Sequence, residues 1–523
     1  MNEQQNPVCK LSEIDNGEMK EVQAGETPVL VVRIEDKCYA VGAHCTHYHA
    51  PLVEGYLSGD RIVCPWHHAC FNGRSGNLEE PPALDSLPNF PVRVSGDDIF
   101  IDVPAEPADR REPMMAMPDP AVDKRTFAII GGGAAGYAAA QTLREDGFQG
   151  RIVMITPEEH LPYDRPNLSK DYLQGSAQPE WIPLRGEEFY DKHEIEIVHE
   201  KVKQVSSDER KVIFESGGSL EYDSLLIATG GIPRKLQLPG SDLGNIFVLR
   251  DFDSADEIIA STRDSQKIAV IGASFIGMEA AASLTKRGRS VTVIAPDSVP
   301  FEKTLGREVG EMFRKVHEAN GVKFCLGENV QSFAGDGQVA KVELASGRSI
   351  ETDAVIVGVG VRPATDFLDR SNLHKDGGVV SDSYLSIGPN IYAAGDIVHF
   401  PDARTGGNIR IEHWRTALQQ GRVAAHNMAR RSTPFTGVPF FWTTQFDVTL
   451  NYVGHASGWD RTVVQGSIEA HDFLIFYVKN ETILAVAGMN RDRELAAWEE
   501  RFRLDRVPRP GDLGDEIVDR AAV

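Results

Sequence analysis

The sequence predicts a multidomain protein in which a β-rich N-terminal module precedes two doubly wound α/β domains and a C-terminal α/β domain. The chain has 523 residues, too long for one hydrophobic core, and this length suggests about three or four domains. In the N-terminal part, Gly and Asp turns separate short apolar segments that we predict as strands: Val29 to Ile34, Arg61 to Val63 and Ile99 to Val103. Two later segments each place a glycine-rich turn between an apolar strand and a helix, which is typical of parallel α/β domains.

The charge and composition exclude some functions. The chain carries 54 basic and 77 acidic residues, and its net charge of −23 argues against nucleic-acid binding, which needs a basic surface. An acidic face could steer a basic redox partner, or it could serve solubility alone. We expect no membrane span, because no run of about eighteen apolar residues occurs. We also expect a cytoplasmic location, because cysteines are few and the N-terminus lacks an apolar signal core.

Two Cys–His pairs lie inside the β-rich module. Cys45-Thr46-His47 is followed, after sixteen residues, by Cys64-Pro65-Trp66-His67. Two thiolates and two imidazoles in this interleaved order suit a Rieske [2Fe–2S] centre, in which two His replace two Cys on one iron. Zinc is the alternative, although zinc fingers usually place both Cys before both His. We therefore predict Cys45, His47, Cys64 and His67 as metal ligands.

The first glycine-rich turn is Gly131-Gly132-Gly133-Ala134-Ala135-Gly136, between a predicted strand over 126–130 and a helix-like segment that starts at Tyr137. In a Rossmann-like dinucleotide-binding unit, the first glycine permits the tight turn and the second lets the pyrophosphate approach. The third glycine allows the helix to pack closely on the sheet. Gly131, Gly133 and Gly136 occupy these three positions.

A second copy of this unit follows a predicted strand over 267–271. It reads Gly272-Ala273-Ser274-Phe275-Ile276-Gly277 and leads into a helix that starts at Met278. Ser274 stands at the position of the middle glycine and is a small substitute that still allows close approach. Two such units in one chain usually bind two dinucleotides, and ordinary βα turns without a ligand are the alternative.

Residues 125 to about 510 resemble the two-dinucleotide-domain flavoprotein reductases, in their ferredoxin-reductase and apoptosis-inducing-factor branch. The matching motifs are LPYDRPNLSK at 161–170, Ala228-Thr229-Gly230, YAAGD at 392–396, Glu412-His413-Trp414 and Phe440-Phe441-Trp442. The N-terminal module resembles Rieske ferredoxins, so the whole chain is similar to a Rieske-containing, apoptosis-inducing-factor-like oxidoreductase. This resemblance implies FAD in the first α/β domain, NAD(H) in the second and a [2Fe–2S] cluster in the module.

The resemblance also implies functions for residues at matching positions. Lys170 would lie near the reactive edge of the flavin and pair with Glu279, and these two are the expected catalytic residues; a purely structural ion pair is the alternative. Asp396 would bind the ribityl chain, and it could also cap a helix after Gly395. The other expected cofactor-binding residues are Glu158, Arg165, Ala228, Thr229, Gly230, Gly272, Ser274, Gly277, Gly395, His413, Trp414 and Trp442.

Both dinucleotide units depart from the family pattern at the acidic residue that binds the adenosine ribose. In the FAD unit this position is Pro157, and Glu158 is expected to take over. In the NAD unit it is Ala295, where Asp297 could substitute. No Arg lies there to hold a 2′-phosphate, so we expect NADH rather than NADPH. Residues 125–324 contain no cysteine, which excludes the dithiol chemistry of disulphide reductases.

The Rieske module departs from the high-potential members of its family. Ala50 and Trp66 stand where those proteins carry two additional Cys, and Ala69 replaces a Ser that would donate a hydrogen bond to the cluster. Because hydrogen bonds to cluster sulfur raise the potential, we expect a low-potential, ferredoxin-like centre that NADH can reduce.

We therefore predict the following division: a Rieske module at 1–103, a proline-rich linker at 104–124, an FAD domain at 125–242 and 372–430, an NAD domain at 243–371 and a C-terminal domain at 431–523. The expected activity is electron transfer from NADH through FAD to the cluster, and then to a one-electron acceptor such as an oxygenase or cytochrome P450. The alternative is an NADH-responsive regulatory flavoprotein in which the Rieske module is a sensor or docking domain. A monomer and a homodimer are both compatible with the sequence.

Overall fold

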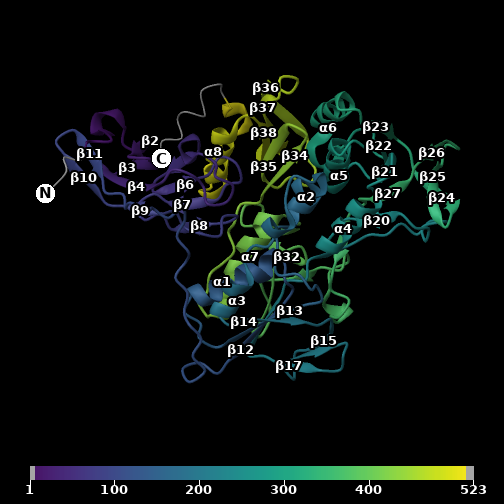
Figure 1. The fold of residues 1–523 in the computed structure, drawn as a ribbon, viewed down its shortest axis with the longest axis horizontal. Helices are drawn as coiled ribbons and strands as arrows, with labels where there is room; N and C mark the ends of the chain where they lie inside the picture. The colour runs from purple at the N-terminus through teal and green to yellow at the C-terminus, as the bar shows by residue number, and fades with distance from the viewer. Residues whose placement is uncertain (1–5, 514–523) are drawn as a thin grey trace.

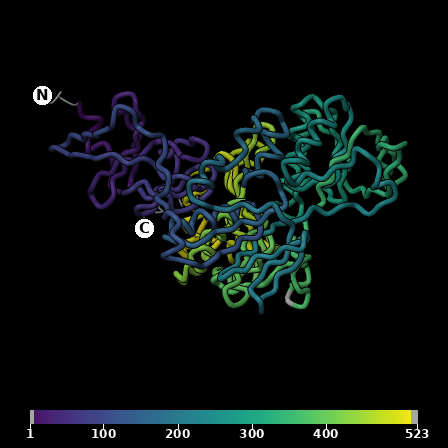
Figure 2. Tube along the Cα trace, turned by 60° about the horizontal axis from the view of Figure 1, so that its bottom comes forward, coloured from purple at the N-terminus to yellow at the C-terminus, as the bar shows by residue number. Residues whose placement is uncertain are grey.

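The computed structural model describes residues 6–513. The β-rich module and the NAD unit lie at opposite ends of the molecule, and the FAD unit and the C-terminal domain lie between them (Figures 1 and 2). The last helix of the C-terminal domain, α8 (Asp492–Arg503), lies beside the β-rich module (Figure 1). Among the described residues, no helix has the length and apolar character needed to cross a bilayer.

The N-terminal module consists of small antiparallel sheets, as the alternation of apolar segments and turns predicts. One sheet has the order β2-β3-β4-β9, with bounds Met19–Ala24, Thr27–Ile34, Lys37–Gly42 and Asn89–Phe90. A second has the order β5-β6-β7-β8, with bounds Tyr56–Ser58, Arg61–Val63, Cys70–Asn72 and Leu78–Glu80. The third has the order β1-β11-β10, with bounds Cys9–Lys10, Asp98–Ile101 and Val92–Ser95. The last predicted strand of the module thus ends two residues before the expected Val103.

The proline-rich segment 104–124 follows the surface of the molecule without a helix or strand. It is nevertheless fastened by backbone hydrogen bonds. Ser86 and Arg111 exchange bonds of 2.9 and 2.8 Å, and the Ala116 N–H donates to the Arg144 carbonyl at 2.8 Å. The linker is therefore attached to the Rieske module at one point and to the FAD unit at another.

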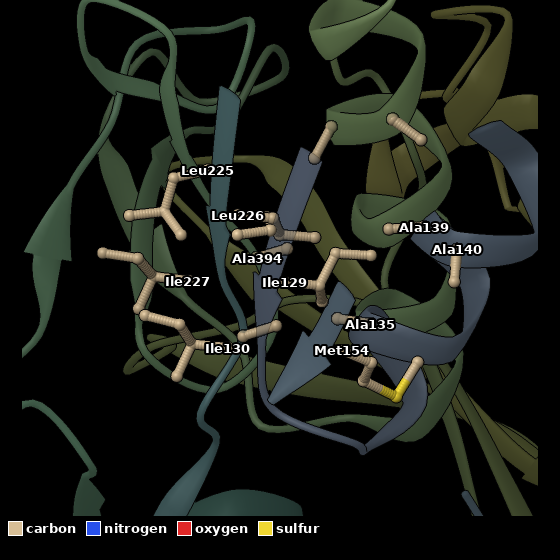
Figure 3. Close-up of a cluster of buried hydrophobic side chains, with 14 of the residues drawn as sticks. Ile129, Ile130, Ala135, Ala139, Ala140, Met154, Leu225, Leu226, Ile227 and Ala394 are labelled. Carbon is tan, nitrogen blue, oxygen red and sulfur yellow. The ribbon is translucent and has the colours of Figure 1, made fainter. Parts of the chain in front are cut away.

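A six-stranded sheet forms the core of the FAD unit. Its order is β14-β13-β12-β18-β31-β30, with bounds Ile195–His199, Arg151–Thr156, Thr126–Ile130, Ser224–Ile227, Ile391–Ala393 and Ser386–Gly388. All pairs except β31–β30 are parallel. The central strands are buried on both faces and so are apolar along their whole length, as Ile129, Met154 and Leu226 show beside Ala139 (Figure 3).

Two helices cross closely on one face of this sheet. Helix α1 (Ala134–Glu145) follows the first glycine turn and starts three residues before the predicted Tyr137. Helix α7 (Trp414–Met428) packs against it. A Cβ atom at Gly421 would lie 2.2 Å from the Ala135 carbonyl oxygen, so this glycine is what allows the close crossing. As a result, the Glu412-His413-Trp414 motif lies beside the first glycine turn.

The NAD unit repeats the parallel arrangement. Its sheet has the order β20-β27-β21-β22-β23, with bounds Ile246–Val248, Ala354–Val357, Lys267–Ile271, Ser290–Ala295 and Lys323–Leu326. Its helices are α4 (Phe252–Ser261), α5 (Phe275–Lys286) and α6 (Glu302–Ala319). Helix α5 starts at Phe275, three residues before the predicted Met278, because Ser274 is its N-cap residue.

Antiparallel strands complete the structure. The C-terminal sheet has the order β34-β35-β38-β37-β36, with bounds Phe440–Gln445, Val448–Gly454, Thr482–Met489, Asp472–Lys479 and Arg461–Ser467. Two three-stranded sheets have the orders β15-β16-β17, with bounds Val202–Ser206, Lys211–Phe214 and Ser219–Glu221, and β24-β25-β26, with bounds Val330–Asp336, Gln338–Leu344 and Ser349–Glu351. A third has the order β29-β32-β33, with bounds Val379–Val380, Val398–Pro401 and Asn408–Arg410. Strands β19 (Gly231–Pro233) and β28 (Val361–Pro363) form a two-stranded sheet. Short helices α2 (Asp171–Gln174) and α3 (Glu187–Lys192) connect the FAD strands. Strand β34 carries the Phe440-Phe441-Trp442 motif to the FAD unit.

Candidate functional site: two cofactor centres joined by an aromatic contact

Two loops of the N-terminal module bring the predicted metal ligands together. One follows β4 and the other connects β6 to β7. Each is closed in the same way: the Cys45 N–H donates to the Ala50 carbonyl, and the Cys64 N–H donates to the Ala69 carbonyl, both at 2.9 Å. These bonds turn each loop back on itself and direct the ligand residues of both loops toward one point.

The four ligand side chains form one cluster. The Nδ1 atoms of His47 and His67 face each other at 3.1 Å, and the buried thiols of Cys45 and Cys64 are hydrogen-bonded to each other. Burial lowers the pKa of His47 to about 3 and lowers that of His67 as well, so both rings are neutral at physiological pH. Neutral imidazoles and adjacent thiols are the donor set that a [2Fe–2S] cluster of Rieske type takes. The residues present therefore fit the predicted cluster.

The surroundings of the ligands agree with a low-potential centre. Ala50 and Ala69 are buried methyl groups beside the two loops, and Trp66 is 40% exposed. All six cysteines of the chain are free, so no disulphide joins the ligand loops. Because Ala69 offers no hydroxyl, this position donates no hydrogen bond that would raise the potential.

The residues expected to hold FAD line two adjoining cavities that share Gly133, Arg165, Ala228, Gly230 and Arg250. The cavities have volumes of about 270 and 410 Å³. The first contains Lys170, Ala228, Glu279, Asp396, His413, Trp414 and Trp442, and the second contains Gly131, Glu158, Ala228 and Thr229. Gly136 and Gly395 line neither cavity. The expected FAD residues thus surround one elongated space that begins at the glycine turn.

The three glycines of the first turn have different surroundings. Gly131 has a φ of +120°, and a Cβ there would lie 2.2 Å from the Ala228 carbonyl oxygen. A Cβ at Gly136 would lie 1.9 Å from the Gly131 carbonyl oxygen, so this glycine allows the helix to pack. At Gly133 the nearest atom to an added Cβ is the Arg165 Nε at 3.9 Å, and the space opens into the cavity. Gly133 is therefore placed where a pyrophosphate could approach the backbone.

The expected pair of Lys170 and Glu279 lies in the wall of the first cavity. The Lys170 Nζ is 2.9 Å from the Glu279 Oε2, which also accepts a hydrogen bond of 2.6 Å from the Ser169 hydroxyl. The other carboxylate oxygen accepts a bond of 2.7 Å from Thr443, next to Trp442 in the chain. Glu279 is almost fully buried, and its three donors come from two separate parts of the fold: the 169–170 segment and strand β34. Sequence reasoning missed Ser169 and Thr443, because hydroxyls carry no pattern that marks such a contact.

His413 is half-buried in the same cavity wall. Burial lowers its pKa to about 3, with a smaller contribution from His455, so the ring is neutral. Its Nδ1 is buried and has no hydrogen-bond partner among the described residues. A buried polar atom without a partner at a cavity wall costs stability unless a ligand supplies the bond, which fits a cofactor in this space.

Trp442 touches both centres. Its side chain lines the first cavity, and its ring lies against the ring of His67, with 4.4 Å between the centroids. The His47 ring is 6.4 Å from the same tryptophan. One aromatic side chain of the C-terminal domain therefore separates the FAD cavity from a ligand of the metal cluster.

Three further contacts concern the predicted acidic residues of the FAD unit. Glu158 binds the Arg165 guanidinium through one oxygen and accepts a bond of 2.6 Å from Tyr163 through the other. Asp396 lies 3.6 Å from the Arg250 guanidinium. The alternative interpretation of Asp396 as a helix cap is wrong: the chain forms a turn at this residue and then strand β32. A turn is favoured there because Gly395 adopts a left-handed φ of +80°.

The second glycine turn has the same design as the first. Gly272 has a φ of +109°, and a Cβ there would lie 2.3 Å from the Gly358 carbonyl oxygen; a Cβ at Gly277 would lie 2.2 Å from the Gly272 carbonyl oxygen. Ser274 is exposed, as an approaching nucleotide requires. The first turn of α5 reaches the FAD cavity through Ile276, which is 44% exposed.

The expected ribose position of the NAD unit holds a salt bridge. Asp297 follows strand β22 and lies 3.0 Å from the Nζ of Lys303, whose side chain is 84% exposed. The sequence had suggested that no Arg is placed here, and the structure adds a lysine that the spacing did not reveal. The expected preference for NADH thus depends on the balance between Asp297, which would repel a 2′-phosphate, and Lys303, which would attract one.

A separate cluster of His374, Asp376 and His399 also has metal-ligand chemistry. The Asp376 carboxylate already accepts bonds from both His side chains, from the Gly378 N–H and from the Arg410 Nε, at 2.9 to 3.0 Å. These donors occupy its lone pairs, and a guanidinium cation disfavours a second cation. The cluster instead holds Arg410, which donates to the Asp396 carbonyl at 2.7 Å.

Three family models match the chain in sequence. The model for the pyridine nucleotide-disulphide oxidoreductases covers residues 125–421, the model for the Rieske [2Fe–2S] domain covers 4–91, and the model for the reductase C-terminal domain covers 440–522. These matches confirm the predicted order of a Rieske module, dinucleotide-binding domains and a C-terminal reductase domain.

Curated proteins and solved structures resemble the same regions. Apoptosis-inducing factor 3 of Homo sapiens is 39% identical over 497 residues, which cover 93% of this chain and 82% of that protein. Rhodocoxin reductase of Rhodococcus erythropolis is 35% identical and covers 75% of this chain and 93% of its own. The ferredoxin reductase for the CYP199A2 system of Rhodopseudomonas palustris is 31% identical, with a TM-score of 0.73 over 76% of this chain and 100% of that one. The covalent putidaredoxin reductase–putidaredoxin complex gives 0.72 at 31% identity, over 75% and 96%.

Proposed function

Since the chain belongs to the pyridine nucleotide-disulphide oxidoreductase family and carries a Rieske [2Fe–2S] domain, we propose that it passes electrons from NADH through FAD to its own cluster. It is an NAD(P)H-dependent FAD oxidoreductase of the ferredoxin-reductase type, with the predicted FAD, NAD and [2Fe–2S] domains. A one-electron acceptor protein then takes the electrons from the cluster. Each NADH loses a hydride, which reduces two one-electron acceptors and leaves NAD⁺ and one proton.

The observation that carries this proposal is the position of Trp442. Its ring packs on the cluster ligand His67 at 4.4 Å and lines the FAD cavity on its other side. An aromatic side chain in contact with both centres provides a short covalent and van der Waals path between them. A Rieske module that served only as a docking domain would not need its ligand histidine at this place.

The residues of the chain position the cofactors and exclude water from them. When bound, FAD accepts a hydride from NADH and releases its two electrons singly, as a [2Fe–2S] cluster requires. We propose that the buried Lys170–Glu279 pair fixes a positive charge beside the flavin, because Glu279 is held by Ser169 and Thr443 as well. Ile276 and Phe275, at the start of α5, would support the nicotinamide side of the cavity.

The external acceptor is proposed by class from the relatives. Several relatives are reductases of ferredoxin-dependent systems, and the names of two mention an O-demethylase and the CYP199A2 system. We propose an oxygenase or a cytochrome P450 as the terminal acceptor. The net charge of −23 favours a partner with a basic docking surface.

The test of this proposal replaces Trp442. In Trp442→Leu we expect flavin reduction by NADH at the wild-type rate, but cluster reduction well below it, because the contact with His67 is lost. Trp442→Phe keeps an aromatic ring and should retain more of the rate. Trp459→Leu is the matched control, because Trp459 packs on Tyr477 in the same domain, away from the cavity. The FAD content of each variant is measured first, and undiminished cluster reduction in Trp442→Leu would remove the support for this path.

A second candidate function is regulation in response to NADH, with the Rieske module as a sensor. The alignment with apoptosis-inducing factor 3 favours it, because it covers 93% of the chain, whereas rhodocoxin reductase covers 75%. This candidate predicts slow reduction of acceptor proteins and a change in sedimentation, from monomer to homodimer or the reverse, when NADH is added. Fast acceptor reduction with unchanged sedimentation would exclude it.

A further inference from the structure

A buried carboxylate links the Rieske module to the reductase. Glu499, on α8, accepts a hydrogen bond of 2.5 Å from His68 Nδ1 through one oxygen and lies 2.7 Å from the Arg415 guanidinium through the other. None of the three side chains is more than 2% exposed. Burial alone would raise the pKa of Glu499, but the charge of Arg415 and the bond from His68 lower it to about 2, so the group is ionised at neutral pH.

The two partners of Glu499 adjoin the two cofactor centres. His68 follows the cluster ligand His67 in the chain, and its backbone has a left-handed φ of +57°, which fixes the direction of the ligand loop. Arg415 follows Trp414, whose side chain lines the FAD cavity. One carboxylate therefore connects the loop that holds the cluster to the helix that borders the flavin.

Further contacts between the module and the reductase surround this carboxylate. Three side chains on one face of α7 donate to successive residues of the module: Arg415 to the Pro81 carbonyl at 2.9 Å, Gln419 to the Glu80 carboxylate at 2.8 Å and Arg422 to the Glu79 carbonyl at 2.8 Å. Additional pairs across the same interface are Arg61–Glu500 at 3.0 Å, Arg185–Asp85 at 2.6 Å and Tyr48–Asp164 at 2.8 Å.

This network makes small displacements of the module unfavourable, although it adds little to the free energy of docking. A buried ion pair gains little over well-packed apolar groups, but a buried charge that loses its partner is strongly unfavourable. A shift of the module that moved His68 away from Glu499 without admitting water would leave such a charge. The apolar contact of Val63 and Cys70 with Ala496 of α8 keeps water out of the interface.

From these contacts we propose that Glu499 is a positioning residue for electron transfer: it holds the Rieske module in one place, with His67 against Trp442, throughout turnover. The module then does not swing on the 104–124 linker to collect its electrons. In the step concerned, one electron leaves the reduced flavin and enters the oxidised cluster, and no bond is formed or broken. The inference rests on the proposed function, because it needs the cluster to be reduced by the flavin.

The first test uses the wild-type holoprotein. Cluster reduction after mixing with NADH is followed anaerobically at increasing glycerol concentrations, with flavin bleaching recorded in the same trace. A fixed module predicts that the flavin-to-cluster step does not slow as viscosity rises, whereas a swinging module makes the step depend on viscosity. A strong dependence on viscosity would overturn the proposal.

The second test compares Glu499→Gln with Glu494→Gln. The amide in Glu499→Gln can accept a bond from only one of His68 and Arg415, so we expect cluster reduction to slow by about tenfold or more and to become viscosity-dependent. Flavin bleaching by NADH and the cluster EPR spectrum should remain as in the wild type, which a general loss of structure would not allow. Glu494 lies on the same helix but pairs with Arg491 inside the C-terminal domain, so its variant should behave as the wild type. Glu499→Asp keeps the charge and should recover part of the rate.

The outcomes separate this inference from the proposed function. If the wild-type cluster is never reduced by NADH, the proposed function fails and the inference fails with it. If the wild-type cluster is reduced but Glu499→Gln reduces it at the same rate and with the same viscosity response, the electron path stands and the positioning function of Glu499 is wrong.

Discussion

Substituting alanine for each glycine of the first dinucleotide turn separates FAD binding from folding. In Gly133→Ala the new Cβ meets no protein atom closer than 3.9 Å and projects into the cavity. In Gly136→Ala the Cβ would lie 1.9 Å from a backbone carbonyl oxygen that cannot move without displacing the turn. The first variant should therefore fold and lose cofactor, and the second should lose stability.

The contacts allow the size of each effect to be estimated. The backbone of Gly133 (φ −86°, ψ −166°) is open to alanine, so the cost to folding is that of a poorer helix N-cap residue, at most about 1 kcal/mol. Its Cβ would occupy the expected place of the pyrophosphate at the helix N-terminus, and losing about 1–3 kcal/mol of binding lowers FAD affinity by about 5- to 150-fold. Overpacking at Gly136 costs about 3 kcal/mol or more, because its neighbour is backbone.

The assay is urea unfolding of the FAD-free proteins, followed by FAD titration monitored through flavin fluorescence. Gly133→Ala should unfold close to the wild-type midpoint and need more FAD to saturate, whereas Gly136→Ala should unfold at clearly lower urea. Wild-type FAD affinity in Gly133→Ala would refute the assignment of this turn to the pyrophosphate. Equal stabilities of the two variants would refute the packing argument at Gly136.

Three further predictions concern the cluster, the nucleotide and the interface. His67→Ala should lose the Rieske EPR signal and should no longer reduce an acceptor protein, while NADH still bleaches the flavin and ferricyanide is still reduced. Reduction of the acceptor protein at the wild-type rate would show that electrons do not pass through the cluster. Lys303→Ala should raise the ratio of kcat/KM for NADH over NADPH by up to about fivefold, because the attraction of an exposed cation for a 2′-phosphate is worth about 0.2–1 kcal/mol. A lower ratio would contradict this. Glu499 faces Arg415, His68 and Arg61, and its pKa in the folded protein is about 2 against an ordinary 4.5. Its contribution to folding stability is therefore complete above pH 4.5, and about 3 kcal/mol of it is lost as the pH falls toward 2. Urea midpoints from pH 6 to pH 3 should fall more steeply in the wild type than in Glu499→Gln, and parallel curves would contradict this.

Sequence patterns predicted those elements of the structure that are determined by residues close together in the chain. The strands over 126–130 and 267–271 begin and end where the sequence places them, because an apolar run followed by a glycine turn determines both. The four expected cluster ligands lie close together, since each loop is closed by a hydrogen bond between residues five apart. Helices α1 and α5 both start three residues earlier than predicted, because the last three residues of each glycine motif already form the first turn of the helix.

Contacts between distant segments could not be predicted in the same way. His68 and Glu499 are 431 residues apart in the chain, and neither stands in a pattern that indicates a partner. Trp442 was expected to line the flavin from the family resemblance, but its contact with His67 depends on how the C-terminal sheet and the Rieske module meet. Packing between domains decides such contacts, and a periodicity or motif within one segment does not record them.

The most direct test of the electron path is anaerobic stopped-flow with NADH, following flavin bleaching and cluster reduction in the same holoprotein. The proposed path predicts that the flavin is bleached first and that the cluster is then reduced at a rate independent of protein concentration, because both centres lie in one chain and are joined through Trp442 and His67. A cluster that stays oxidised, or one whose reduction rate rises in proportion to protein concentration, would contradict it.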